Sequence, residues 1–220
     1  MSTDRRTFLA WAGGTAALTA TPLTLGAEPA PMLPTQSDFD FTWMRRVTGK
    51  YRAVLDAPEV EGGIPVVRAV VWGMQYAAAF GVPMSQISQV LVLRHHAIEL
   101  AMGDAYWARF PLATELKFFD GAGQPLRKNP VRAERPEMPE AFRPLTLEKF
   151  QANGGIVLAC DLALAHYVVP RYAATGLSAA EARAAAVKDL LPGVILQPSG
   201  IFAVSAAQDV GCRFVPASAM

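Results

Sequence analysis

One cysteine and two histidines are the side chains of this sequence best suited to chemistry, because they lie at the ends of apolar runs that predict buried strands. Cys160 ends the run IVLAC at 156–160, and His95 and His96 follow the run ISQVLVLR at 87–94. A thiolate attacks sulfur electrophiles, and a nearby imidazole can lower a thiol pKa or move protons. A thiol beside two imidazoles also suits copper or zinc. These residue types predict either sulfur chemistry or a metal site, provided that the fold brings them together.

Strands are expected to alternate with helices along the chain. Apolar runs bounded by Gly, Pro or polar residues predict five strands, and longer runs bounded by cap residues predict four helices. The expected strands are 51–57, 87–97, 156–160, 194–198 and 212–216, and the expected helices are 62–82, 146–155, 178–193 and 199–211. This order, with an unbroken apolar centre in 87–97, predicts an α/β fold. Its mostly parallel five-stranded sheet would carry helices on both faces, a flavodoxin-like three-layer arrangement.

The helices carry predictions of their own. Thr146, Ser178 and Ser199 are expected N-caps, with a capping box at Ser178. An alternative for Ser199 is an anion site at the helix start. The helix at 62–82 is apolar nearly all round and is expected to be buried. Pro170 is expected to break the helix that follows Cys160, because proline lacks the backbone N–H that a helix interior needs.

A parallel sheet would place the cysteine and the histidines on one rim, because parallel strands end at the same edge. Adjacent residues on a strand point to opposite faces, so we expect one of His95 and His96 to face Cys160. The alternative is that either histidine only caps the strand end through backbone hydrogen bonds. His166 follows Cys160 by six residues on the next helix and is expected to be less directly placed.

The position of Cys160 favours a reactive thiol over a packed one. A helix starts directly after it, and free backbone N–H groups with the positive helix end stabilise a thiolate. Asp161 opposes this effect unless its carboxylate points away or caps the helix. The alternative is that Cys160 is a small buried hydrophobe.

A disulfide between Cys160 and Cys212 is not expected. Cys160 ends its strand, whereas Cys212 begins the last one. In a parallel sheet the two sulfurs would lie at opposite edges, roughly 17 Å apart along a five-residue strand. A disulfide needs Cα atoms within about 7 Å.

The N-terminus is typical of a twin-arginine export signal. Arg5 and Arg6 precede a short apolar run that contains glycines and threonines, and the run ends at small residues near Ala27. We expect a signal peptide over 1–27, a proline-rich tether over 28–48, and a periplasmic location for one domain over 49–217. The alternative is a retained membrane anchor, which the short, glycine-rich run interrupted by Pro22 disfavours.

Charge and hydropathy exclude two classes of partner. Of the 20 basic and 19 acidic residues, two basic and one acidic belong to the expected signal, which leaves 18 of each. This even balance contains no basic block suited to nucleic acid or an anionic membrane surface. No later stretch is long and apolar enough to predict a membrane span in the mature chain.

The order of these elements resembles the DsrE/DsrF-like family of small sulfur-relay proteins over residues 50–97 and 146–216. The motifs that carry the resemblance are GGIVLAC at 154–160, LLPGV at 190–194, PSG at 198–200 and Q-x-x-G at 208–211. The resemblance implies an α/β protein that assembles as a homotrimer or hexamer. It also implies that Cys160 carries sulfane sulfur as a persulfide. The shared rim, rather than the resemblance, makes His96 or His95 the expected helper.

Export adds a requirement, because an exported relay protein needs its own periplasmic sulfur donor or acceptor. Two alternatives remain beside sulfur relay. One is a non-catalytic protein that holds copper, zinc or a small ligand at the Cys/His rim, and the other is a structural subunit. No organic cofactor is expected.

Two segments depart from the compact pattern of the family. Residues 98–145 form an insertion with a hairpin expected around Asp120 and Gly121, followed by a proline-rich loop. Residues 166–189 form an unusually long link. Both segments leave the rim near Cys160, so each is a candidate for a lid over it or for a replacement of the partner-docking surface of a cytoplasmic relay protein.

Overall fold

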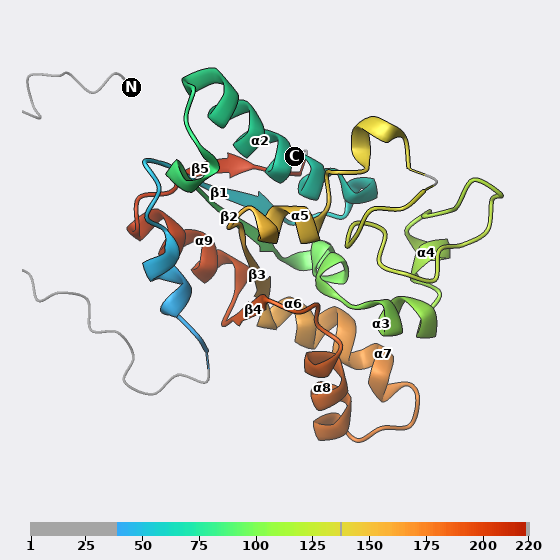
Figure 1. Cartoon of the computed structure of the whole chain (residues 1–220). Coiled ribbons are helices and arrows are strands. Elements are labelled where there is room, and N and C mark those ends of the chain that lie inside the picture. Colours follow the sequence, from blue (N-terminus) through green and yellow to red (C-terminus); the bar gives the residue numbers. More distant parts are fainter. Residues whose placement is uncertain (1–38, 137, 219–220) are drawn as a thin grey trace, which may run out of the picture. The chain divides into compact units, whose positions relative to one another are not determined.

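A single five-stranded sheet organises the computed structural model, which describes residues 39–136 and 138–218. The strand order is β4-β3-β2-β1-β5, and every neighbouring pair is parallel (Figure 1). Helices cover both faces of the sheet, so the predicted α/β fold is confirmed. The expected signal peptide and residues 28–38 of the expected tether lie outside the described residues.

The strands lie close to their predicted positions. They are β1 (Tyr51–Ala57), β2 (Ile87–Leu93), β3 (Ile156–Cys160), β4 (Val194–Gln197) and β5 (Arg213–Pro216). The α-helices are α2 (Ile64–Phe80), α3 (Asp104–Arg109), α4 (Leu112–Glu115), α5 (Leu147–Ala152), α6 (Asp161–Ala163), α7 (Val169–Ala173), α8 (Ala179–Lys188) and α9 (Gly200–Asp209). Short 3-10 helices are η1 (Thr42–Arg46), η2 (Glu61–Gly63), η3 (Met84–Gln86), η4 (His95–Ala101) and η5 (Glu140–Phe142), and η6 (Leu164–Val168) is a π-helix.

The handedness of the crossovers explains which helix covers which face. From β1 to β4, each new strand is added on the same side of the previous one across the sheet. Right-handed crossovers therefore place the connecting helices on the same face. Residues of α2, α5 and α8 accordingly share one core cluster. The last crossover reverses direction to reach β5, and α9 therefore packs in the cluster on the opposite face (Figure 1).

Alternation along the strands builds the two core layers. Leu91, Leu93 and Val157 belong to one cluster, whereas Val90 and Val92 belong to the other. Every residue of β2 is buried, as its unbroken apolar centre predicts for a strand covered on both sides.

The predicted helix caps are confirmed. Thr146 accepts a hydrogen bond from the backbone N–H of Lys149, and Ser199 accepts one from Phe202. Ser178 and Glu181 form the reciprocal capping box. Three helices therefore begin where the sequence places a hydroxyl residue.

The prediction that the helix at 62–82 is buried throughout is wrong for its second half. Val66, Ala69 and Val70 are buried, but Met74 and Phe80 are 49% and 55% exposed. Aromatic rings in this half stack on one another instead, with Phe80 4.7 Å from the ring of Tyr51. Apolar composition did not distinguish core contact from this aromatic column at the protein surface.

Pro170 does not end the helix that follows Cys160, contrary to the prediction. The chain stays helical from α6 through η6 to α7, with Pro170 in the first turn of α7. The wide π turn over Leu164–Val168 directly precedes it. Widening the turn accommodates a residue that lacks the N–H and would clash with the preceding turn.

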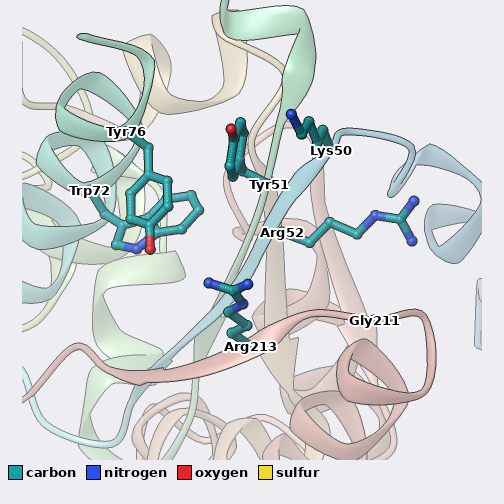
Figure 2. A pocket seen from close by; sticks show the side chains of 7 residues that line it. All are labelled: Lys50, Tyr51, Arg52, Trp72, Tyr76, Gly211 and Arg213. Atoms are coloured by element: carbon teal, nitrogen blue, oxygen red, sulfur yellow. The ribbon is translucent and has the colours of Figure 1, made fainter. Parts of the chain in front are cut away.

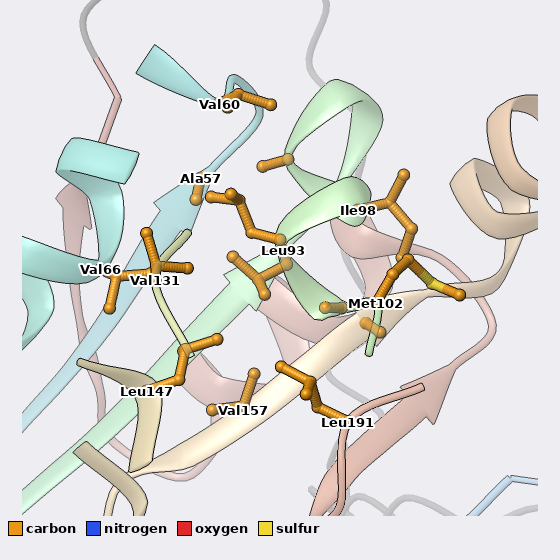
Figure 3. Packing of buried hydrophobic residues seen from close by; sticks show 14 of the residues in the cluster. Ala57, Val60, Val66, Leu93, Ile98, Met102, Val131, Leu147, Val157 and Leu191 are labelled. Carbon is orange, nitrogen blue, oxygen red and sulfur yellow. The ribbon is translucent and has the colours of Figure 1, made fainter. Parts of the chain in front are cut away.

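The insertion at 98–145 is part of the core rather than a loose loop. Figure 3 shows Ile98, Met102 and Val131 of this segment in the same cluster as Leu93 and Val157. The expected hairpin is reduced to one antiparallel bridge between Phe119 and Pro125, closed by a turn at Asp120.

The described end of the expected tether packs against the sheet. Trp43 in η1 is fully buried in the same cluster as α9. Within residues 39–136 and 138–218, no helix has the length and apolarity needed to cross a membrane.

Candidate functional site

Cys160 is the last residue of β3 and lies at the carboxyl edge of the sheet, as predicted. Its Sγ accepts a hydrogen bond from the backbone N–H of Ala163 at 3.3 Å, so the sulfur caps the following helix. Only 6% of the residue is exposed. The sulfur therefore sits in a recess where a backbone donor stabilises negative charge on it.

Cys160 contributes to the wall of an open hollow of about 250 Å³. Three carboxyl strand ends supply this hollow, which we call the thiol hollow. Its residues are Arg94, His95, Cys160, Leu162, Ala163, His166, Tyr167, Ser199, Gly200 and Ile201. Leu162 and Ile201 stand 65% and 74% exposed at the surface. The hollow thus combines one thiol, one guanidinium and two imidazoles with an apolar rim.

Arg94 is the cation of the thiol hollow, and the sequence reasoning did not single it out. Its guanidinium donates two hydrogen bonds to the buried carboxylate of Asp56, at 2.7 and 2.8 Å. The hydrogen bond to Asp56 raises the pKa of Arg94, although partial burial opposes this rise. Arg94 and Cys160 line the same hollow, so a positive charge stands at the site of the thiol.

The PSG motif at 198–200 packs closely against Arg94, and the missing side chain of Gly200 makes this close contact possible. A Cβ at Gly200 would lie 2.4 Å from the Cβ of Arg94 and 2.6 Å from its Cδ. No other residue type allows α9 to start so close to the stem of Arg94. The motif is therefore required by packing, and Ser199 is an N-cap as expected.

The sequence-based objection from Asp161 is weakened. Its carboxylate accepts a hydrogen bond from Arg183 of α8 at 2.8 Å. This partner offsets the negative charge next to the thiol. Cys212 lies just before β5, at the opposite edge of the parallel sheet, and both cysteines are free, as predicted.

The expectation that His95 and His96 point to opposite faces of a strand is wrong. β2 ends at Leu93, and His95 adopts a left-handed conformation with φ of 49°. η4 begins at this residue, and the two imidazole rings lie 4.2 Å apart between centroids. His95 lines the thiol hollow, and His96 lies beyond its lining.

His166 belongs to the thiol hollow, although its spacing from Cys160 gave no clear placement. It lines the hollow, and its ring lies 4.7 Å from that of Tyr167. The link at 166–189 therefore contributes to the site through its first two residues. None of the described residues of the insertion at 98–145 belongs to the lining of the hollow.

Glu59 is a further candidate that the sequence reasoning missed. Its Oε1 lies 2.9 Å from Nδ1 of His95. Among the described residues, Glu59, His95 and His96 form a group whose potential metal-ligand atoms all lie within 4.8 Å of one another. Cys160 is not in this group, so the expected Cys/His ligand set is replaced by two histidines and a carboxylate.

A different hollow lies at the amino edge of the sheet, away from all of these residues. Figure 2 shows Arg213, Arg52 and Lys50 around it, together with the stacked rings of Trp72 and Tyr76. These residues come from the starts of β1 and β5 and from α2. Arg52 donates hydrogen bonds to the backbone carbonyls of Gly49 and Val210. Its guanidinium therefore stabilises the local fold.

Comparison with known proteins adds no further assignment. No family model, curated protein or solved structure matches the chain. The resemblance to the DsrE/DsrF-like family stays a prediction from the motifs. The candidate site accordingly rests on the geometry of the carboxyl edge alone.

Proposed function

We propose that this protein carries sulfane sulfur as a persulfide on Cys160. The observation that carries the proposal is the placement of the thiol in an open hollow that Arg94 also lines, with the backbone N–H of Ala163 donating a hydrogen bond to the sulfur. A backbone donor and a nearby cation favour the thiolate, which is the nucleophilic form of cysteine. The motifs around Cys160 and Gly200 that resemble the sulfur-relay family support the same chemistry.

The proposed step is a transfer of one sulfur atom from a donor persulfide. The Cys160 thiolate attacks the outer sulfur of the donor R–S–SH, so a new S–S bond forms on Cys160 while the S–S bond of the donor breaks. The donor leaves as the thiolate R–S⁻, and the transferred sulfur keeps its hydrogen. Charge and electrons balance without an added oxidant. Discharge to an acceptor thiolate is the same step in reverse.

The hollow suits this exchange in shape and charge. Arg94 lies where it can stabilise the negative charge that moves between the attacking and leaving sulfurs. Its position is fixed by two hydrogen bonds to Asp56 and by contact with Gly200. The exposed side chains of Leu162 and Ile201 offer an apolar rim to a partner protein that presents its own thiol.

Intact mass spectrometry before and after polysulfide treatment tests the proposal. Wild type should gain the mass of one sulfur atom, and Cys160→Ser should not. Cys212→Ser is the matched control, because burial raises the pKa of the Cys212 thiol to about 11, and this variant should gain sulfur like wild type. A wild type that gains no sulfur, or a Cys160→Ser variant that still gains it, would overturn the proposal.

The proposed carrier acts in the periplasm after twin-arginine export. Arg5 and Arg6 before the short apolar run support this location. Replacing both with lysine should leave the chain in the cytoplasm, measured by fractionation against the unchanged signal. Equal periplasmic recovery of the two forms would contradict the export route and would leave the chemistry of Cys160 as a separate question.

A further inference from the structure

The carboxyl edge holds a second cluster of side chains, which shares only His95 with the thiol hollow. Glu59 lies two residues beyond the end of β1, and His95 lies two residues beyond the end of β2. Ala57 and Leu93, the last residues of these strands, are paired in register. The two side chains therefore leave the sheet at the same level, and His96 joins them as the next residue.

The backbone at His95 gathers the two imidazoles on one side. Its φ of 49° lies in the left-handed region, which few residues other than glycine adopt. Continued strand geometry would send adjacent side chains to opposite faces. The turn instead brings the rings within 4.2 Å of each other. A costly conformation that assembles potential ligands is typical of a functional site.

Contacts around the cluster hold each of its members in place. The ring of Tyr167 lies 5.2 Å from that of His95 and 4.6 Å from that of His96. The Ser218 hydroxyl accepts a hydrogen bond from the N–H of Glu59 at 3.2 Å and donates one to its carbonyl oxygen at 3.0 Å. The cluster is thus built from fixed backbone and packed rings, which is what preorganised metal ligands require.

We propose that Glu59, His95 and His96 bind one divalent transition-metal ion of the zinc class. Two imidazole nitrogens and one carboxylate oxygen are a ligand set that zinc accepts while keeping a position open. The ion would take the place of the proton shared between Nδ1 of His95 and Oε1 of Glu59, which are 2.9 Å apart. The side chains of this pair are 46% and 43% exposed, so solvent can complete the coordination shell.

The metal site is separate from the thiol hollow in its ligands, although His95 borders both. Cys160 is outside the cluster of ligand atoms. His166 packs against the same Tyr167 ring but is not in the cluster, which makes it a matched control histidine. Sulfur carriage on Cys160 and metal binding by the triad can therefore succeed or fail independently.

Titration of the purified full chain with Zn²⁺ against a chromophoric chelator tests the site. Wild type should bind one ion per chain. His95→Ala, His96→Ala and Glu59→Gln should each weaken binding at least about tenfold. His166→Ala and Cys160→Ser should bind as wild type does. No binding by wild type, or an equal loss in the two control variants, would overturn the proposal.

Cobalt gives a second measurement that does not depend on variants. Co²⁺ bound by wild type should show ligand-field absorption and no thiolate-to-metal charge-transfer band. A thiolate band would place the ion on a cysteine and overturn the assignment. The unfolding temperature of each variant without metal checks that the exposed substitutions leave the fold intact.

Discussion

Glu99 should make the stability of this protein fall as pH rises. The residue lies in η4, only 4% exposed, and burial raises the pKa of its carboxyl from 4.5 to about 7. Arg171 opposes this rise, with its Nε 3.5 Å from Oε1 of Glu99. The ion pair does not offset the burial, because the same guanidinium donates two hydrogen bonds to Glu115.

The sign and size follow from proton linkage. A carboxyl whose pKa is higher in the folded state holds its proton more tightly when folded, so folding is most favoured below pH 4.5. This contribution is lost as pH rises through about 7. The difference between 4.5 and about 7, at roughly 1.4 kcal/mol per pKa unit, corresponds to about 3 kcal/mol.

Urea unfolding of wild type and Glu99→Gln across this pH range measures the effect. The glutamine variant should lack the fall and should be more stable than wild type above pH 7, by up to about 3 kcal/mol. Glu148→Gln is the control, since Glu148 is 53% exposed and pairs with Arg132 at the surface. It should track wild type within about 1 kcal/mol.

The opposite result would refute the reasoning. If Glu99→Gln lost stability above pH 7, the pairing with Arg171 would outweigh the burial of the carboxylate. If its pH profile ran parallel to that of wild type, the pKa of Glu99 would be the same in the folded and unfolded chains. Either outcome would mean that the charge at Glu99 is better solvated or better paired than its burial indicates.

Three further predictions concern packing and assembly. Gly200→Ala should destabilise the fold by about 1–3 kcal/mol in urea unfolding, because the new Cβ meets Arg94 at 2.4 Å; an unchanged midpoint would contradict this. Thr146→Ala should cost about 1 kcal/mol by removing the cap of α5, measured in the same way, and a neutral result would mean that water replaces the hydroxyl. The family resemblance predicts a homotrimer, and a monomer in sedimentation equilibrium would contradict it.

Local patterns were enough to predict the sheet. The bounds of β1 at 51–57 and of β3 at 156–160 match the predicted strands, because Lys50 and Pro58 flank the first and Gly155 and Asp161 flank the second. The hydroxyl caps at Thr146 and Ser199 were equally readable, since capping is an interaction within three residues. Parallel pairing then followed from strands that are buried on both faces.

The details of the site depended on contacts that the sequence does not display. The prediction extended the strand over 87–97, and nothing in the residue types after Leu93 marked the left-handed turn at His95. Glu59 became a candidate only through the register of β1 against β2. Arg94 was passed over because its partner, Asp56, lies 38 residues earlier and is joined to it across the sheet.

The strand order indicates that the thiol hollow lies where open α/β sheets bind their ligands. Right-handed crossovers carry the chain after β3 to the face covered by α8, and carry the chain after β4 to the face covered by α9. The connections from these adjacent strands therefore diverge and open a crevice at their carboxyl ends. Ligands of open α/β sheets bind at such a switch point. Cys160 ends one of the two strands, and Gly200 begins the helix that follows the other. The cysteine thus lies where the strand order alone would place a ligand, independently of any family motif.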